Sequence, residues 1–106
     1  MTISRIWHGW TTPANADAYE NLLKSEIFPG ILARKIDGFK RIDLLRRPVE
    51  GEVEFITVMW FDSWAAVKEF AGDHMDHAVV PPKARAVLAR FDPTSQHYEV
   101  KESRQP

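Results

Sequence analysis

The segment 53–61, Val-Glu-Phe-Ile-Thr-Val-Met-Trp-Phe, constrains the fold more than any other part of the sequence. Its residues are those of a β-strand, in which successive side chains point to opposite faces of a sheet. Both faces are then apolar, with Val53, Phe55, Met59 and Phe61 on one and Ile56, Val58 and Trp60 on the other. A strand of this kind has to be covered on both sides.

The first third of the chain predicts a strand followed by a long helical segment. Residues 3–11 are rich in β-forming types, and Thr12-Pro13 ends the strand with a helix cap and a proline at the first helical position. Apolar residues then recur at helical spacing from residue 14 to about 35. Because Pro29-Gly30 falls inside this run, we expect a kink or two consecutive helices.

The middle of the chain predicts a hairpin. Residues 39–47 alternate, with Ile42 and Leu44 on one side, and form a half-exposed strand. The polar stretch 48–52 is typical of a hairpin connection to the strand 53–61.

The last third predicts a second helix and a final strand. Asp62-Ser63 caps a helix over 64–71, which Gly72 ends. Its expected inner face consists of Trp64, Val67, Phe70 and Ala71. Residues 73–82 form a loop, 83–91 a short third helix, and 95–101 the last strand, after the break at Asp92-Pro93.

This order of elements predicts one domain, residues 1–106, of the α+β class with a ferredoxin-like βαββαβ topology. We expect a four-stranded antiparallel sheet, with the first and third strands central and parallel and both helices on one face. The other face would expose several hundred Å² of apolar surface, worth about 25 cal/mol per Å². A second copy is the simplest cover, as a homodimer through the sheet faces, and the rival cover is residues 83–91 folding across the sheet.

Composition excludes several classes of function. A formal net charge of −1 argues against nucleic-acid binding, and the lack of cysteine excludes thiolate metal sites and iron–sulfur clusters. No apolar run is long enough to span a bilayer, and the first residues lack the pattern of a signal peptide, so the expected location is the cytoplasm. Four tryptophans and six phenylalanines exceed what so small a core needs, which favours a ligand pocket or an interface.

Four short segments resemble the antibiotic-biosynthesis-monooxygenase family of dimeric α+β barrels. They are Ile6-Trp7-His8-Gly9, Met59-Trp60-Phe61-Asp62-Ser63-Trp64, Phe70-Ala71-Gly72-Asp73 and His97-Tyr98-Glu99-Val100. The likeness spans roughly residues 3–100 and is greatest to small, uncharacterised members. It implies the dimeric ferredoxin-like fold and an oxidoreductase activity, that of a monooxygenase.

The family's functional residues carry over only in part. Cofactor-independent members place a tryptophan at the end of the third strand, which Trp60 matches, but their asparagine and tyrosine fall here on Ile56 and Ala66. Haem-degrading members use an asparagine on the first strand, where this chain has Trp7 and His8. Their helix tryptophan falls on or near Phe70, and His74 or His77 could stand in for their iron ligand.

The predicted topology places His8, Trp10, Trp60 and His97 in one neighbourhood. Two imidazoles beside apolar walls could form a catalytic acid/base pair, or could bond to each other, to water or to backbone. The predicted ligand-binding residues are aromatic: Trp7, Trp10, Trp60, Trp64 and Phe70. They would line a cleft between sheet and helices, or pack in the core or the dimer.

The histidines of Asp73-His74-Met75-Asp76-His77 are candidate haem or metal ligands, and a solvated loop explains the same residues. Two functional hypotheses follow. The first is a monooxygenase-like enzyme without a cofactor, acting on a planar aromatic or polyketide-like small molecule. The second is a non-catalytic protein that binds haem or another hydrophobic small molecule.

Overall fold

β1 (Ile3–Thr11) runs through the middle of the sheet in the computed structural model, which describes residues 1–106. It pairs along its whole length with β3 (Glu52–Phe61), which in turn pairs with the edge strand β2 (Phe39–Val49). Two short strands, β4 (Arg90–Phe91) and β5 (Gln96–Glu99), pair with the other side of β1. The ferredoxin-like arrangement is confirmed, with β1 and β3 central.

Two expectations about the sheet are wrong. β1 and β3 are antiparallel, not parallel, because the tight hairpin between β2 and β3 reverses the chain direction. The fourth strand is divided into β4 and β5, so the sheet has five strands. The break at Asp92-Pro93 explains the division, since proline has no N–H to donate to the ladder.

The β2–β3 hairpin is tighter than the sequence indicates, because Val49 pairs with Glu52 and only Glu50-Gly51 form the turn. Gly51 has φ +74°, a conformation that glycine adopts without strain. Pro48 is tolerated inside β2 because this strand lies at the edge of the sheet.

The predicted long helix is present as two consecutive helices. α1 (Ala16–Leu22) continues through a π-helical turn, η2 (Leu23–Ile27), into α2 (Phe28–Ala33). The widened turn comes directly before Pro29, which lacks the N–H that a regular helix would use there. A short 3₁₀ turn, η1 (Pro13–Asn15), precedes α1 and is capped by the Thr12 hydroxyl, as predicted.

α3 (Trp64–Ala71) has the predicted bounds, with the Ser63 hydroxyl accepting from the Ala66 N–H. Its inner face holds Val67 and Phe70 as expected, but Trp64 is 38% exposed and Ala66 is buried instead. The predicted third helix is shorter than expected: α4 (Pro82–Val87) ends before β4 begins.

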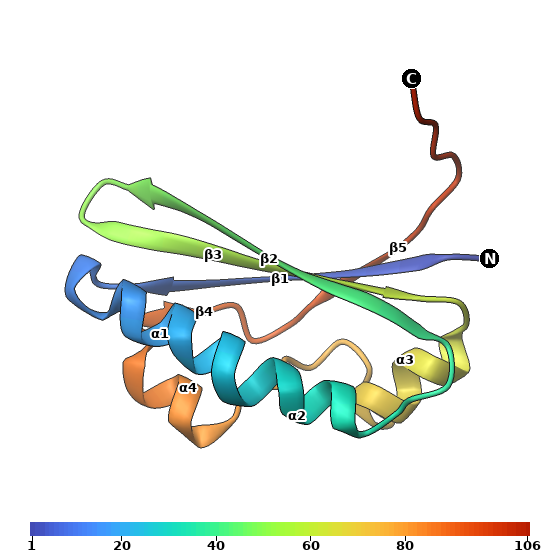
Figure 1. Ribbon diagram of the computed structural model, residues 1–106, viewed down its shortest axis with the longest axis horizontal. Coiled ribbons are helices and arrows are strands. Elements are labelled where there is room, and N and C mark those ends of the chain that lie inside the picture. Colours follow the sequence, from blue (N-terminus) through green and yellow to red (C-terminus); the bar gives the residue numbers. More distant parts are fainter.

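All helices lie on one face of the sheet, as Figure 1 shows. α4 packs beside α1 on that face, so residues 83–91 do not cover the opposite one. The buried core consists of two clusters, one around Phe61, Met59 and Phe70 and the other around Phe55 and Tyr19. No helix combines the length and the apolar character needed to cross a membrane.

Candidate functional site

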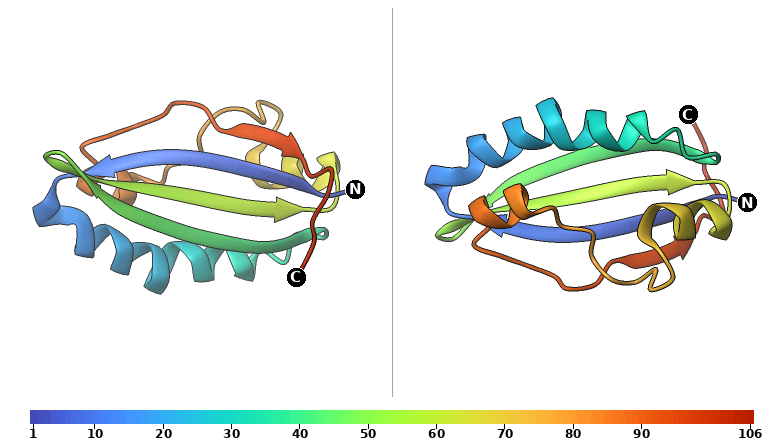
Figure 2. Two further views of the ribbon diagram at one scale, coloured as in Figure 1. Left: turned by 90° about the horizontal axis from the view of Figure 1, so that it is seen from above. Right: turned by 90° about the horizontal axis from the view of Figure 1, so that it is seen from below.

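A cleft lies between the sheet and the helices, in the space that separates the two core clusters. The helices share one face of the sheet but lie along its two edges. Figure 2 shows α1 and α2 along the β2 edge, and α3, α4 and the segment between them along the edge of β4 and β5. The cleft is lined from both sides and from the sheet: Arg5, Trp7, Tyr19, Leu23, Ile27, Phe28, Ile31, Ile42, Thr57, Met59, Phe70, Val79, Val80, Pro81, Ala84 and Ser95.

The cleft is largely filled by its own side chains. Its volume is about 60 Å³, room for about two water molecules, whereas an apolar cavity that takes benzene is about 150 Å³. Val79, on the segment between α3 and α4, is 45% exposed. A ring-sized ligand therefore requires the lining side chains or the 79–81 segment to move outward.

Arg5 is the only charged residue that lines the cleft. It is 3% exposed, and its guanidinium donates to the carbonyls of Met75 and His77 and to Nε2 of His97. The guanidinium also lies 5.4 Å from the ring centre of Phe70. Burial lowers the pKa of Arg5 to about 10, opposed by the charge of Asp76. No carboxylate contacts this cation.

His97 connects Arg5 to Asp76. Its Nε2 lies 2.9 Å from the Arg5 nitrogen and its Nδ1 lies 3.1 Å from Asp76 Oδ1. Since Arg5 can only donate, Nε2 is the acceptor and Nδ1 carries the hydrogen, which assigns the neutral tautomer. Burial and then the nearby Arg5 charge lower the pKa of His97, against the hydrogen bond that His97 donates to Asp76.

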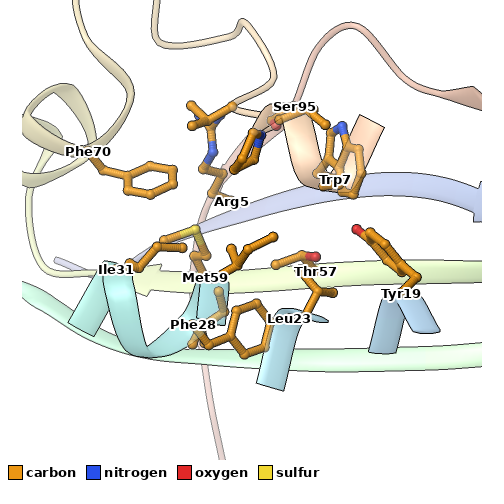
Figure 3. A pocket seen from close by; sticks show the side chains of 16 residues that line it. Arg5, Trp7, Tyr19, Leu23, Phe28, Ile31, Thr57, Met59, Phe70 and Ser95 are labelled. Atoms are coloured by element: carbon orange, nitrogen blue, oxygen red, sulfur yellow. The ribbon is translucent and has the colours of Figure 1, made fainter. Parts of the chain in front are cut away.

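Three hydroxyl groups complete the polar part of the cleft: those of Tyr19, Thr57 and Ser95. None makes a hydrogen bond within the chain, although Tyr19 is 1% exposed and Ser95 is 4% exposed. The Thr11 hydroxyl is the one side-chain polar atom that is fully enclosed without a partner. The other three hydroxyls are therefore not fully enclosed, and Figure 3 shows the Tyr19 hydroxyl turned into the cleft.

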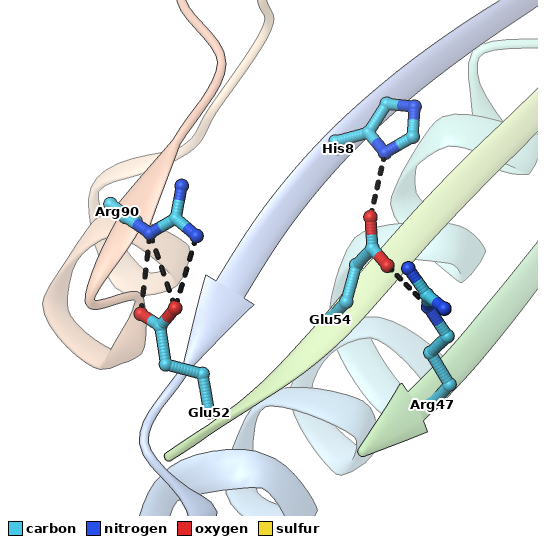
Figure 4. Close-up of polar contacts among 5 residues, drawn as sticks. All are labelled: His8, Arg47, Glu52, Glu54 and Arg90. Atoms are coloured by element: carbon cyan, nitrogen blue, oxygen red, sulfur yellow. Dashed lines mark hydrogen bonds and ion pairs between the residues drawn. The ribbon is translucent and has the colours of Figure 1, made fainter. Parts of the chain in front are cut away.

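The opposite face of the sheet carries a separate polar network. Glu54 accepts from Arg47 at 2.6 Å and lies 3.1 Å from Nδ1 of His8 (Figure 4). The hydrogen bond from Arg47, followed by that from His8, lowers the pKa of Glu54. Beside it, Arg90 pairs with Glu52.

Apolar side chains surround this network on the helix-free face. Register places Ile6 beside Val58, and His8 beside Ile56, on the same side of β1 and β3. Trp10 stacks on His8 with ring centres 6.1 Å apart and lies under Arg90. This helix-free surface is called the open face below.

Of the predicted neighbourhood of His8, Trp10, Trp60 and His97, the structure brings only His8 and Trp10 together. Odd-numbered residues of β1 face the helices and even-numbered ones face away, and His97 pairs with Arg5 while His8 pairs with Ile56. His97 is thus on the cleft side and His8 on the open face. Trp60 also lies on the open face, opposite Ser4, where it donates to Asp43 at 2.9 Å.

Of the predicted ligand-binding aromatics, Trp7 and Phe70 line the cleft, while Trp10, Trp60 and Trp64 do not. Trp7 is held in place by a hydrogen bond from its indole N–H to the Asp92 carbonyl at 2.8 Å. Trp64 contacts the edge of the His97 ring instead, at 5.7 Å between ring centres.

His74 and His77 stack on each other with ring centres 5.0 Å apart, in the exposed segment between α3 and α4. Neither lines the cleft. No group of three or more metal-ligating side chains gathers in the structure. The two histidines thus occupy the solvated loop that the sequence also allowed.

Sequence reasoning missed Arg5 and the three hydroxyls. The signal for Arg5 was present, because it alternates with Ile3 and Trp7 on the inward side of a central strand, where a charge is unusual. Ser95 gave no signal, since its place depends on the bend between β4 and β5.

No sequence-family model and no curated protein sequence matches the chain. Solved structures do match it along nearly its whole length. A proposed antibiotic biosynthesis monooxygenase from Bacillus cereus is 17% identical, covers 99% of this chain and 98% of its own, and superposes with a TM-score of 0.70.

Two further similar structures differ in what they bind or do. A mutant of SnoaB, a cofactor-independent oxygenase from Streptomyces nogalater, is 16% identical over 96% of this chain and 95% of its own, with a TM-score of 0.60. A mutant of MhuD with two manganese protoporphyrin IX molecules bound per active site is 23% identical over 98% and 99%, with a TM-score of 0.58. The ferredoxin-like α+β fold that the sequence resemblance implied is confirmed.

Proposed function

We propose that this chain is a monooxygenase-like enzyme that works without a cofactor on a planar aromatic or polyketide-like molecule bound in the cleft. The observation that carries the proposal is the cleft's composition: an apolar chamber with unbonded hydroxyls and one buried cation. Ligand sites combine apolar walls with a few placed polar groups in this way. The fold shared with a cofactor-independent oxygenase supports the reaction class.

In the proposed reaction, a substrate CH₂ group next to a carbonyl loses a proton to form an enolate. The enolate passes an electron to dioxygen, and the two radicals combine into a peroxide anion. The peroxide O–O bond then breaks as the C–H bond gives the new carbonyl, and the hydroxide that leaves takes up the released proton to become water. The chain would contribute by favouring the enolate and by excluding bulk water. Tyr19 and Thr57 would hold the substrate's oxygen atoms, and Trp7 and Phe70 would pack on its rings.

We propose other roles for the two histidines predicted as catalytic. His97 does not line the cleft, and both its ring nitrogens are engaged, so we propose it as a positioning residue for Arg5. His8 lies on the open face with Glu54, apart from the cleft.

A haem-binding protein is the alternative that the MhuD likeness raises. No histidine is placed to serve as an axial ligand in this cleft, because His74 and His77 lie outside it and His97 has no free nitrogen. Haem titration should give no Soret shift that depends on any of these three histidines.

We also propose that two copies pair through their open faces. Ile56 and Val58 lie there only half-buried, and Tyr98 is 55% exposed, with no helix above them. This pairing would cover the second apolar side of β3 and enclose the network of His8, Glu54 and Arg47.

The direct test is oxygen uptake with anthrone, a planar tricyclic ketone with an activated CH₂ group, without added haem, flavin or metal. We expect anthraquinone to form faster with the protein than in buffer. Tyr19→Phe should lower kcat/KM by about tenfold or more, because a cleft hydrogen bond is lost.

Tyr98→Phe is the matched control, since Tyr98 is the only other tyrosine and lies on the open face. It should leave the rate unchanged. Equal rates with and without protein, over a series of enolisable planar ketones, would remove the enzyme proposal.

A further inference from the structure

The charge balance around Arg5 carries an inference about the ligand. A buried cation is ordinarily paired with a carboxylate, because desolvation without a counter-charge is costly. Here the cation contacts two backbone carbonyls and a neutral imidazole. The nearest acid acting on it is Asp76, whose side chain is 77% exposed and is reached through His97.

The guanidinium also has unused donors. A guanidinium has five N–H groups, and the bonds to Met75, His77 and His97 use three of them, which leaves the Nε–H and one Nη2–H. The Nε nitrogen has no partner within the chain and is not fully enclosed, and Arg5 lines the cleft. Two adjacent donors of arginine match the two oxygens of a carboxylate or one charged oxygen.

The other polar groups of the cleft lie farther along the sheet. Arg5 pairs across the sheet with Met59, and Thr57 is two residues along β3, which is about 7 Å in a strand. Figure 3 shows Arg5 with Ser95 at one side of the cleft and Tyr19 with Thr57 at the other. Apolar and aromatic side chains lie between these two polar ends.

We infer that the cleft selects an anionic ligand: a flat apolar skeleton whose negatively charged oxygen binds Arg5 and whose far end accepts or donates a hydrogen bond at Tyr19 and Thr57. This inference rests on the proposed function for the location of the site and adds the charge of the substrate. Asp76 competes for the same cation, through His97, so it weakens the binding of the anion.

The test compares two isosteric probes by isothermal titration calorimetry near neutral pH. Naphthalene carboxylate should bind at least about tenfold more tightly than naphthalene carboxamide, because a hydrogen bond to a charged partner is the stronger one. A nitro-substituted naphthol that is ionised at neutral pH tests which kind of anion the site accepts. Tight binding of this phenolate means that the site accepts any aromatic oxyanion, and weak binding means that it accepts carboxylates only.

Because Arg5 also holds the segment between α3 and α4, Arg5→Gln could fail to fold. Asp76→Asn avoids this problem, since the asparagine oxygen can still accept from His97 Nδ1–H while the charge is removed. It should tighten carboxylate binding by about two- to tenfold and leave carboxamide binding unchanged. Asp73→Asn is the control, because Asp73 lies in the same segment but pairs with Lys68.

Equal affinity for the two probes, no binding of either, or an Asp76→Asn variant that weakens carboxylate binding would overturn the inference. Turnover of neutral anthrone without any preference for anions would contradict the anion site and leave the enzyme proposal intact. Tight carboxylate binding with no oxygen uptake on any enolisable substrate would contradict the enzyme proposal and leave the anion site intact.

Discussion

The two neighbours of His97 require opposite hydrogen-bonding roles from its two ring nitrogens. Arg5 needs an acceptor at Nε2, and Asp76 needs a donor at Nδ1, so only the neutral ring with its hydrogen on Nδ1 satisfies both. The side chain is 4% exposed, so water cannot easily take the place of either partner. Protonation would bring two positive charges together in the core.

This arrangement predicts how stability depends on pH. The pKa of His97 is lowered in the folded protein from 6.5, so the unfolded chain binds the proton more readily. The stability is therefore fully present above pH 6.5 and falls as the pH drops through the folded pKa. Thermal unfolding measured in steps from about pH 8 to pH 5 should show this loss, and His97→Gln should remove the dependence in that range.

The carboxylates with lowered pKa values, Glu20, Glu54 and Glu99, titrate below 4.5 and so do not confuse the comparison. A flat profile for the unchanged protein would mean that His97 does not control the acid response.

Among the elements, the turn between α2 and β2 depends on a single glycine. Gly38 has φ +89°, and its carbonyl accepts from the Asp62 N–H at 2.8 Å. A Cβ at this position would meet the side chains of Asp62 and Ala66. The turn thus fixes where β2 starts relative to the end of β3.

Gly38→Ala should lower the free energy of unfolding by about 1–3 kcal/mol, measured by denaturant titration. Gly30→Ala is the matched control, because Gly30 lies inside α2 with no atom near its missing Cβ. It should raise stability by about 0.5–1 kcal/mol. Comparable losses in both variants would show that the turn geometry is not the cause.

The local pattern of the chain predicts these elements well but not their relations across the sheet. Capping at Thr12 and Ser63 and the start and end of β1 and α3 follow from neighbouring residues alone. The site depends on the register between β1 and β5, which sets Arg5 beside His97 and excludes His8. Register follows from long-range packing, so no local pattern in the sequence contains it.

At the scale of the whole molecule, helices cover one face of the sheet and leave the other face uncovered. The helices bury Phe55, Met59 and Phe61 on one face, while Ile56 and Val58 on the other remain partly exposed. The proposed contact between two open faces would bury the exposed residues of both copies.

This asymmetry predicts a particle with a mass near twice 12.2 kDa by light scattering. Ile56→Lys should shift the protein to the monomer, because two unpaired charges would be buried at the centre of the contact. Leu32→Lys is the control, since Leu32 is 56% exposed on α2, away from the open face. A monomeric unchanged protein would contradict the pairing.

The alternation of β1 also determines how this protein can be redesigned. Arg5 and Trp7 face the chamber, while Ile6 and His8 face the other way. If the two proposals hold, substitutions at odd positions should alter ligand choice and substitutions at even positions should alter self-association, with little interference between them. Deleting one residue from the middle of the strand would turn all residues on one side of the deletion to the opposite face, so β1 should tolerate substitutions far more readily than a change of length.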